Sequence, residues 1–164
     1  MSGNIAIGIQ DFSTIIQGNY FYIDKTPFIK EWWDCGDSAT LITRPRRFGK
    51  TLTMSMVEQF FSIDYAGRSD LFEHLAIWKE EKYRELQGTY PVISLSFARI
   101  KERDYEKTKQ KMCEVLRNIY IKFCYIKDSE KLTDADRAYY ERMLEENIKE
   151  TDATSSLYQL SDFL

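Results

Sequence analysis

Residues 41–53 read Leu-Ile-Thr-Arg-Pro-Arg-Arg-Phe-Gly-Lys-Thr-Leu-Thr, and this stretch decides the fold that the sequence predicts. A short apolar and β-branched run comes first, and a loop that contains one glycine follows it. From Lys50 onward, apolar residues recur at the spacing of a helix with one buried face. Strand, loop and helix in this order can direct backbone N–H groups at a phosphate. The stretch therefore predicts a phosphate-binding loop.

The loop carries each chemical group that such a site needs. Gly49 permits close approach of the backbone, Lys50 can reach the outer phosphates of a nucleotide, and the Thr51 hydroxyl can bind Mg²⁺. The usual pattern, G-x-x-x-x-G-K-[ST], has glycine where this chain has Arg44, so a purely structural turn is the alternative interpretation. We expect Thr51 to be the metal ligand, and we expect ATP to be bound by Arg46, Arg47, Phe48, Gly49, Lys50, Thr51 and Leu52.

The rest of the chain reads as a helix-rich α/β protein. Capping residues followed by apolar periodicity predict helices after Asp11, Thr26, Asp104 and Thr133. Aromatic and β-branched runs predict short strands at residues 20–23, 39–43 and 90–97.

Composition limits the possible functions. The chain has 164 residues and a formal net charge of −3, so no global positive field would attract nucleic acid. Its apolar runs are only a few residues long, which predicts a cytoplasmic protein that does not enter a membrane. The main basic cluster is Arg44, Arg46 and Arg47, which can contact nucleotide phosphate or DNA, or can pair with carboxylates elsewhere in the fold.

Two motifs resemble those of the AAA-ATPase-like proteins. One is Tyr22-Ile23-Asp24-Lys25-Thr26, and the other is the eight-residue loop from Arg44 to Thr51. The resemblance spans nearly the whole chain and implies that arginine is usual at position 44. It also implies a P-loop ATPase, often fused to a C-terminal nuclease domain.

The resemblance leads to expectations about architecture. We expect a partial three-layer α/β/α P-loop domain with a parallel sheet truncated at its C-terminal end. Residues 1–38 would form an N-terminal extension, and residues 39–164 the first half of the nucleotide-binding core. Strands absent from this chain would separate the loop strand from the strand near residues 91–97, so exposed sheet edges are expected to cause self-association.

The resemblance also bears on activity. Hydrolysis needs a carboxylate that supports magnesium, and no apolar strand ending in an acidic residue is evident. We therefore expect nucleotide binding without turnover by this chain alone. Asp24 and Lys25 occupy the place where related proteins put a segment that borders the base, although a helix-start and ion-pair role is equally consistent. The rival hypothesis for the whole chain is a non-catalytic module that binds proteins or associates with nucleic acid and retains a relic phosphate loop.

Overall fold

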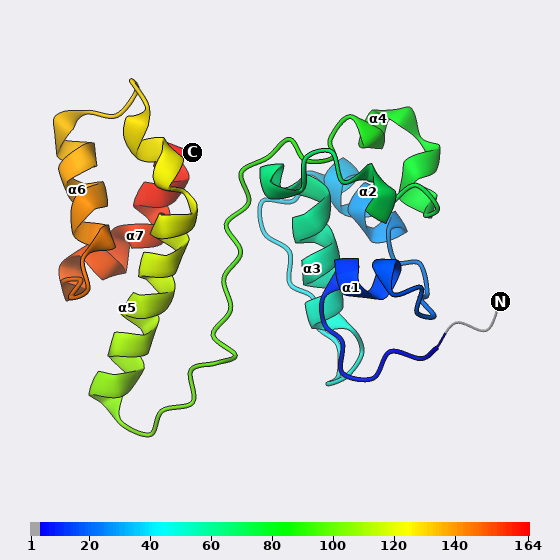
Figure 1. The fold of residues 1–164 in the computed structure, drawn as a ribbon, viewed down its shortest axis with the longest axis horizontal. Helices are drawn as coiled ribbons and strands as arrows, with labels where there is room; N and C mark the ends of the chain where they lie inside the picture. The colour runs from blue at the N-terminus through cyan, green and yellow to red at the C-terminus, as the bar shows by residue number, and fades with distance from the viewer. Residues whose placement is uncertain (1–3) are drawn as a thin grey trace. The chain divides into compact units, whose positions relative to one another are not determined.

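The structure is a computed structural model that describes residues 4–164, and it is built from helices (Figure 1). The chain divides into two compact units, one ending at Val92 and one running from Ile93 to Leu164. Each unit has its own cluster of buried apolar side chains. The two units are therefore described separately.

The first unit contains helices and short 3₁₀ turns. In chain order they are α1 (Phe12–Gln17), α2 (Pro27–Cys35), α3 (Lys50–Phe61), η1 (Ile63–Tyr65), η2 (Ser69–Leu71), η3 (Ala76–Lys79) and α4 (Glu81–Arg84).

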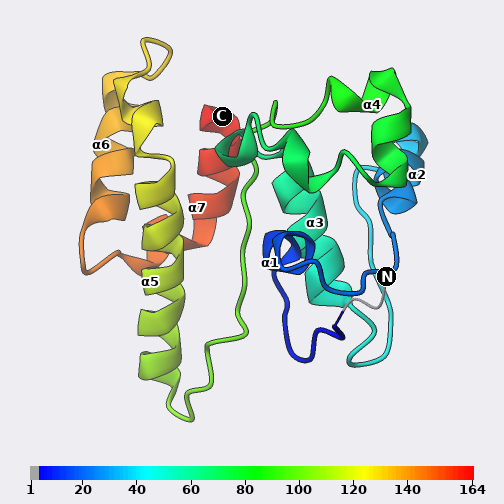
Figure 2. The same cartoon turned by 45° about the vertical axis from the view of Figure 1, so that its right-hand side comes forward.

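Helix α3 is the centre of this unit, and α1 packs against it in both views (Figures 1 and 2). Its C-terminal half enters an aromatic cluster, in which Phe60 meets Phe72 edge-on and Phe61 stacks on Trp33. The centroid distances are 5.1 Å and 5.4 Å, within the range of favourable ring contacts. Because this end of α3 is buried, its N-terminal end is held in a fixed position on the surface.

The second unit consists of three long helices and one 3₁₀ turn: α5 (Tyr105–Lys122), η4 (Cys124–Asp128), α6 (Asp134–Leu144) and α7 (Glu150–Phe163). The three α-helices pack against one another (Figure 1). Asp104 caps α5 by accepting from the Lys107 N–H, and Thr133 and Asp136 form a reciprocal capping box at α6. These predicted helix starts are confirmed.

The predicted helices of the first unit are also confirmed, with one difference in detail. The Asp11 side chain accepts from the Thr14 N–H at the start of α1, as a capping residue should. Thr26 precedes α2 but makes no capping bond with its side chain, which is used elsewhere. Gly36 ends α2 in the left-handed conformation that favours glycine.

The expected fold class, a three-layer α/β/α domain around a parallel sheet, is wrong for this structure. Residues 4–164 form no sheet, and the β-pairing found there is one isolated parallel bridge between Ser62 and Tyr90. Residues 39–43 and 91–97 belong to no helix, turn or strand ladder, and Leu41 is 84% exposed. A strand needs a neighbour for its backbone N–H and C=O groups, and no other described segment provides one here.

Part of the strand pattern nevertheless has a packing consequence. Along residues 93–96, Ile93 and Leu95 lie against the buried cluster of the second unit, whereas Ser94 and Ser96 are exposed. The alternation of side chains therefore follows the period of an extended chain, although no sheet is formed.

Candidate phosphate site

The loop before α3 turns sharply at two left-handed residues. Arg47 has φ of 67° and Gly49 has φ of 76°. The usual motif has glycine at position 44, which would allow a positive φ there. Arg44 is not among the positive-φ residues of the described chain, so the loop does not need glycine at this position. Arg47 adopts the unusual conformation instead, at a cost of roughly 1–2 kcal/mol for a residue that carries a β-carbon.

The N-terminus of α3 offers free backbone donors. Gly49 is the capping residue and has no side chain to accept from the first turn, so no side-chain cap bond forms. The first helical bond of this end joins the Thr53 N–H to the Gly49 carbonyl, at 2.8 Å. The N–H groups of Lys50, Thr51 and Leu52 precede that bond and point out of the helix end, where the helix dipole favours an anion.

The Lys50 side chain closes the loop. Its ammonium group donates to the Arg44 carbonyl, six residues back along the chain. This bond places the positive charge inside the turn formed by residues 44–50. Lys50 and Thr51 are exposed, so both side chains are accessible from solvent.

The arginines of the loop are exposed and form no ion pair within residues 4–164, so the interpretation that they pair with carboxylates is not borne out in the described chain. Arg46 and Arg47 instead line the same hollow as Gly49, Lys50 and Thr51. The site is therefore strongly positive although the whole chain is acidic.

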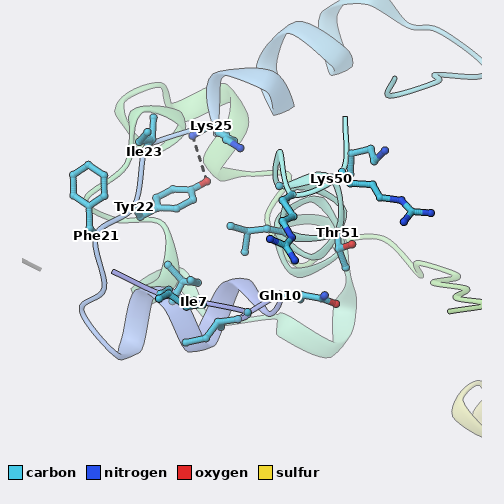
Figure 3. Close-up of a pocket in the computed structure, with 16 residues that line it drawn as sticks. Ile7, Gln10, Phe21, Tyr22, Ile23, Lys25, Lys50 and Thr51 are labelled. Atoms are coloured by element: carbon cyan, nitrogen blue, oxygen red, sulfur yellow. Dashed lines mark hydrogen bonds between the residues drawn. The ribbon is translucent and has the colours of Figure 1, made fainter. Parts of the chain in front are cut away.

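The hollow has a volume of about 860 Å³ and two chemically different walls. One wall is the basic loop and the start of α3. The other is largely apolar, and it is formed by residues 6–10 together with Ile15 and the segment from Phe21 to Ile23 (Figure 3). In this view Ile7 and Gln10 lie along the lower edge, below Lys50 and Thr51. A volume of several hundred cubic ångströms is typical of small-molecule sites.

Most of the predicted site residues come together. Six of the seven line the hollow: Arg46, Arg47, Gly49, Lys50, Thr51 and Leu52. Phe48 is not among the lining residues, and its ring is exposed. The sequence pattern did not indicate the apolar wall, because residues 6–10 carry no motif of their own.

The hollow also gathers a residue from the Tyr22–Thr26 motif. Lys25 lines it, and a β-carbon built on Gly49 would lie 2.7 Å from the Lys25 ammonium nitrogen. A side chain at position 49 would thus fill space that Lys25 occupies. The Asp24 carboxylate accepts from the Thr26 N–H and hydroxyl just before α2, so the helix-start part of the alternative role is seen. The ion-pair part is not, because neither Asp24 nor Lys25 forms an ion pair among residues 4–164.

Two other kinds of feature are absent from residues 4–164. No group of three or more histidine, cysteine, aspartate or glutamate side chains there could hold a metal ion. None of the helices between residues 4 and 164 combines the length and apolar character that crossing a membrane requires.

A helix start that lacks a side-chain cap, preceded by a basic loop with left-handed turns, has the backbone features with which helix N-termini bind anions. Residues 6–158 match the family described as predicted AAA-ATPase, and the chain belongs to this AAA-ATPase-like family. This confirms the resemblance that the two motifs indicated.

A curated relative comes from Azotobacter chroococcum mcd 1 and is named as an uncharacterized protein in the vnfD 5' region. It is 33% identical over 113 residues, which is 68% of this chain and 20% of the relative. The chain thus matches only about one fifth of that protein's length. No solved structure matches the chain significantly.

Proposed function

We propose that this chain binds ATP with Mg²⁺ through the loop from Arg46 to Leu52, as the nucleotide-binding part of an AAA-ATPase-like protein. The observation that carries the proposal is the start of α3, where Gly49 leaves the first-turn N–H groups without a side-chain cap beside the Lys50 ammonium. Oriented N–H groups, the helix dipole and a lysine act together on a phosphate.

The two walls of the hollow fit the two ends of a nucleotide. The basic wall suits the phosphates. The apolar wall of residues 6–10 and Phe21 suits a base, which stacks well on apolar and aromatic surface. In this proposal residues 1–38 are an extension that completes the site, and residues 39–164 belong to the nucleotide-binding core.

Magnesium would be held through Thr51 and the phosphates. A hydroxyl at the second residue of the helix is the protein ligand that P-loop sites supply, and Mg²⁺ commonly keeps most of its ligands from phosphate and water. The chain's own contribution is then to orient the metal–phosphate group, not to enclose the ion.

Calorimetric titration of the 1–164 chain with ATP and ADP tests the binding. Lys50→Ala should weaken ATP binding at least about tenfold, because a charge-assisted contact to phosphate is lost. Lys79→Ala is the matched control, because Lys79 is an exposed lysine of the same unit that does not line the hollow. A folded wild-type chain that binds neither nucleotide, or binds ATP equally well with Lys50→Ala, would favour the rival interaction module.

The magnesium ligand has a separate test. Thr51→Val should remove most of the gain in ATP affinity that Mg²⁺ confers, while binding of metal-free ATP changes little. An unchanged Mg²⁺ effect in this variant would remove Thr51 from the site.

Two further expectations stay predictions. If the exposed Arg46 and Arg47 contact DNA, affinity should fall as salt rises, and replacing both with alanine should flatten that dependence. If the exposed apolar residues, such as Leu41, drive self-association, sedimentation should show concentration-dependent oligomers.

A further inference from the structure

Lys25 lies at the phosphate loop although it is far from it in sequence. Its ammonium nitrogen would be only 2.7 Å from a β-carbon on Gly49, and its side chain lines the hollow together with Lys50 and Thr51. Figure 3 shows Lys25 beside Tyr22, on the side of the hollow opposite Ile7. Two lysines from different segments thus line the same hollow.

The backbone on both sides of Lys25 is fixed by hydrogen bonds to η3. Asp24 accepts from the Ala76 N–H at 2.7 Å with one oxygen and from the Thr26 N–H and hydroxyl with the other. The buried Thr26 hydroxyl in turn accepts from the Ile77 N–H at 3.1 Å. These bonds hold Lys25 in a fixed place between two anchored neighbours.

A third contact ties this segment directly to α3. The Tyr22 hydroxyl accepts from the Lys25 N–H at 3.3 Å and donates to the Met56 sulfur at 3.3 Å. Burial raises the pKa of Tyr22 to about 12, with a smaller upward effect of the Asp24 charge, against the lowering effect of the bond from Lys25. The hydroxyl therefore remains protonated at neutral pH, and the contact to α3 persists.

The charge of Lys25 is not neutralised by the protein. The carboxylate next to it, Asp24, is used by Thr26 and Ala76, and Lys25 has no ion pair among residues 4–164. Four positively charged side chains therefore line one hollow: Lys25, Arg46, Arg47 and Lys50. Such a cluster is costly unless it binds an anion.

We propose that Lys25 is a second phosphate-contacting lysine, which acts with Lys50 on a polyphosphate and makes the site select nucleotides by the number of their phosphates. This inference rests on the proposed function and adds a role for the N-terminal extension in it. The Asp24–Thr26 contacts to η3 position Lys25 without touching the ligand.

The test compares ligands that differ only in phosphate number. Affinities of the 1–164 chain for ATP, AMP and adenosine are measured by competition against a fluorescent ATP analogue, for wild type, Lys25→Met, Lys25→Arg, Lys50→Ala and the control Lys79→Met. Lys25→Met should weaken ATP roughly ten- to a hundredfold and adenosine less than about threefold. Lys25→Arg should recover part of the ATP affinity, because it restores the charge, and Lys79→Met should match wild type.

The outcomes separate the two proposals. If Lys50→Ala weakens ATP but Lys25→Met binds all three ligands as wild type does, the role of Lys25 is wrong and the proposed function stands. If Lys25→Met weakens ATP and adenosine equally, Lys25 only supports the structure, and the inference is again wrong. If wild type binds no nucleotide, or Lys50→Ala binds like wild type, the proposed function itself fails.

Discussion

Buried hydrogen bonds join different kinds of element in the two units. In the second unit, tyrosine hydroxyls donate to backbone carbonyls: Tyr120 to Ser156 at 2.7 Å and Tyr140 to Tyr120 at 2.6 Å. These bonds join helix to helix inside the core. In the first unit, carboxylates and hydroxyls join loops and a short helix to neighbouring elements, as in the contact of Thr26 with Ile77.

The difference indicates where function resides. In the second unit the buried tyrosine hydroxyls bond to carbonyls of neighbouring helices, so these polar groups serve the packing of the core. The first unit also satisfies its buried Thr26, but it leaves the cations around Gly49 unpaired on the surface. All the residues that line the hollow belong to the first unit, so we expect ligand-dependent effects there.

The largest expected effect comes from removing a ring of the first core. Phe72 is fully buried, and its ring lies 5.1 Å from those of Phe12 and Phe60. Phe72→Ala should lower the free energy of unfolding by about 3–5 kcal/mol, because it leaves a cavity. All three tryptophans lie in this unit, so tryptophan fluorescence during urea unfolding reports on it selectively. Phe21→Ala, at a ring that is 61% exposed, is the control and should change stability by less than about 1 kcal/mol.

A smaller effect is expected for the tyrosine contacts of the second unit. Tyr140→Phe keeps the ring but leaves the buried Tyr120 carbonyl without its donor, which should cost about 1–3 kcal/mol. Hydrogen exchange in α5 and α6 would measure the loss. Tyr158→Phe, at a side chain that is 69% exposed, should leave exchange unchanged. If Tyr140→Phe and Tyr158→Phe show the same hydrogen exchange, the buried Tyr140 hydroxyl does not stabilise the second unit.

Loss of the Thr26 hydrogen bond should lower stability by a similar or slightly smaller amount. Thr26→Val has nearly the same shape but cannot accept from the Ile77 N–H, so the first unit should lose about 1–2 kcal/mol. Thr26→Ser retains the hydroxyl and should be closer to wild type. If valine proves as stable as threonine in tryptophan-detected unfolding, this hydrogen bond does not anchor the segment that carries Lys25.

The smallest expected effect is the contribution of Asp11 to the pH dependence of stability. Partial burial alone would raise the pKa of Asp11, but hydrogen bonds from Ser13, Thr14 and Gln59 together outweigh it and hold the pKa below its ordinary value of 3.8. A carboxyl with a lowered folded pKa stabilises the fold fully above its unfolded pKa, and this contribution is lost as pH falls through the folded value.

Asp11→Asn should therefore lower the stability of the first unit by up to about 1 kcal/mol at neutral pH. It should also reduce the acid sensitivity of unfolding below about pH 4. Tryptophan-detected unfolding of both proteins across this range is the measurement. Parallel pH profiles would show that Asp11 has the same pKa in the folded and unfolded chains.

Local signals in the sequence predicted the helices well. The Asp11 cap, the Asp104 cap and the Thr133 capping box act within one helical turn, so they can be read without knowledge of the fold. The strand predictions failed for the opposite reason. A strand at residues 39–43 depends on neighbours elsewhere in the chain, and its local composition does not reveal whether they exist.

For the candidate site, the sequence by itself determined the loop, its charge and the helix that begins at Lys50, because these depend on consecutive residues. Only the tertiary structure decided that the positive φ falls at Arg47, that residues 6–10 form an apolar wall, and that Lys25 reaches Gly49. Each of these depends on packing between segments distant in sequence, and side-chain contacts at such separation are fixed by the whole core and not by local preference.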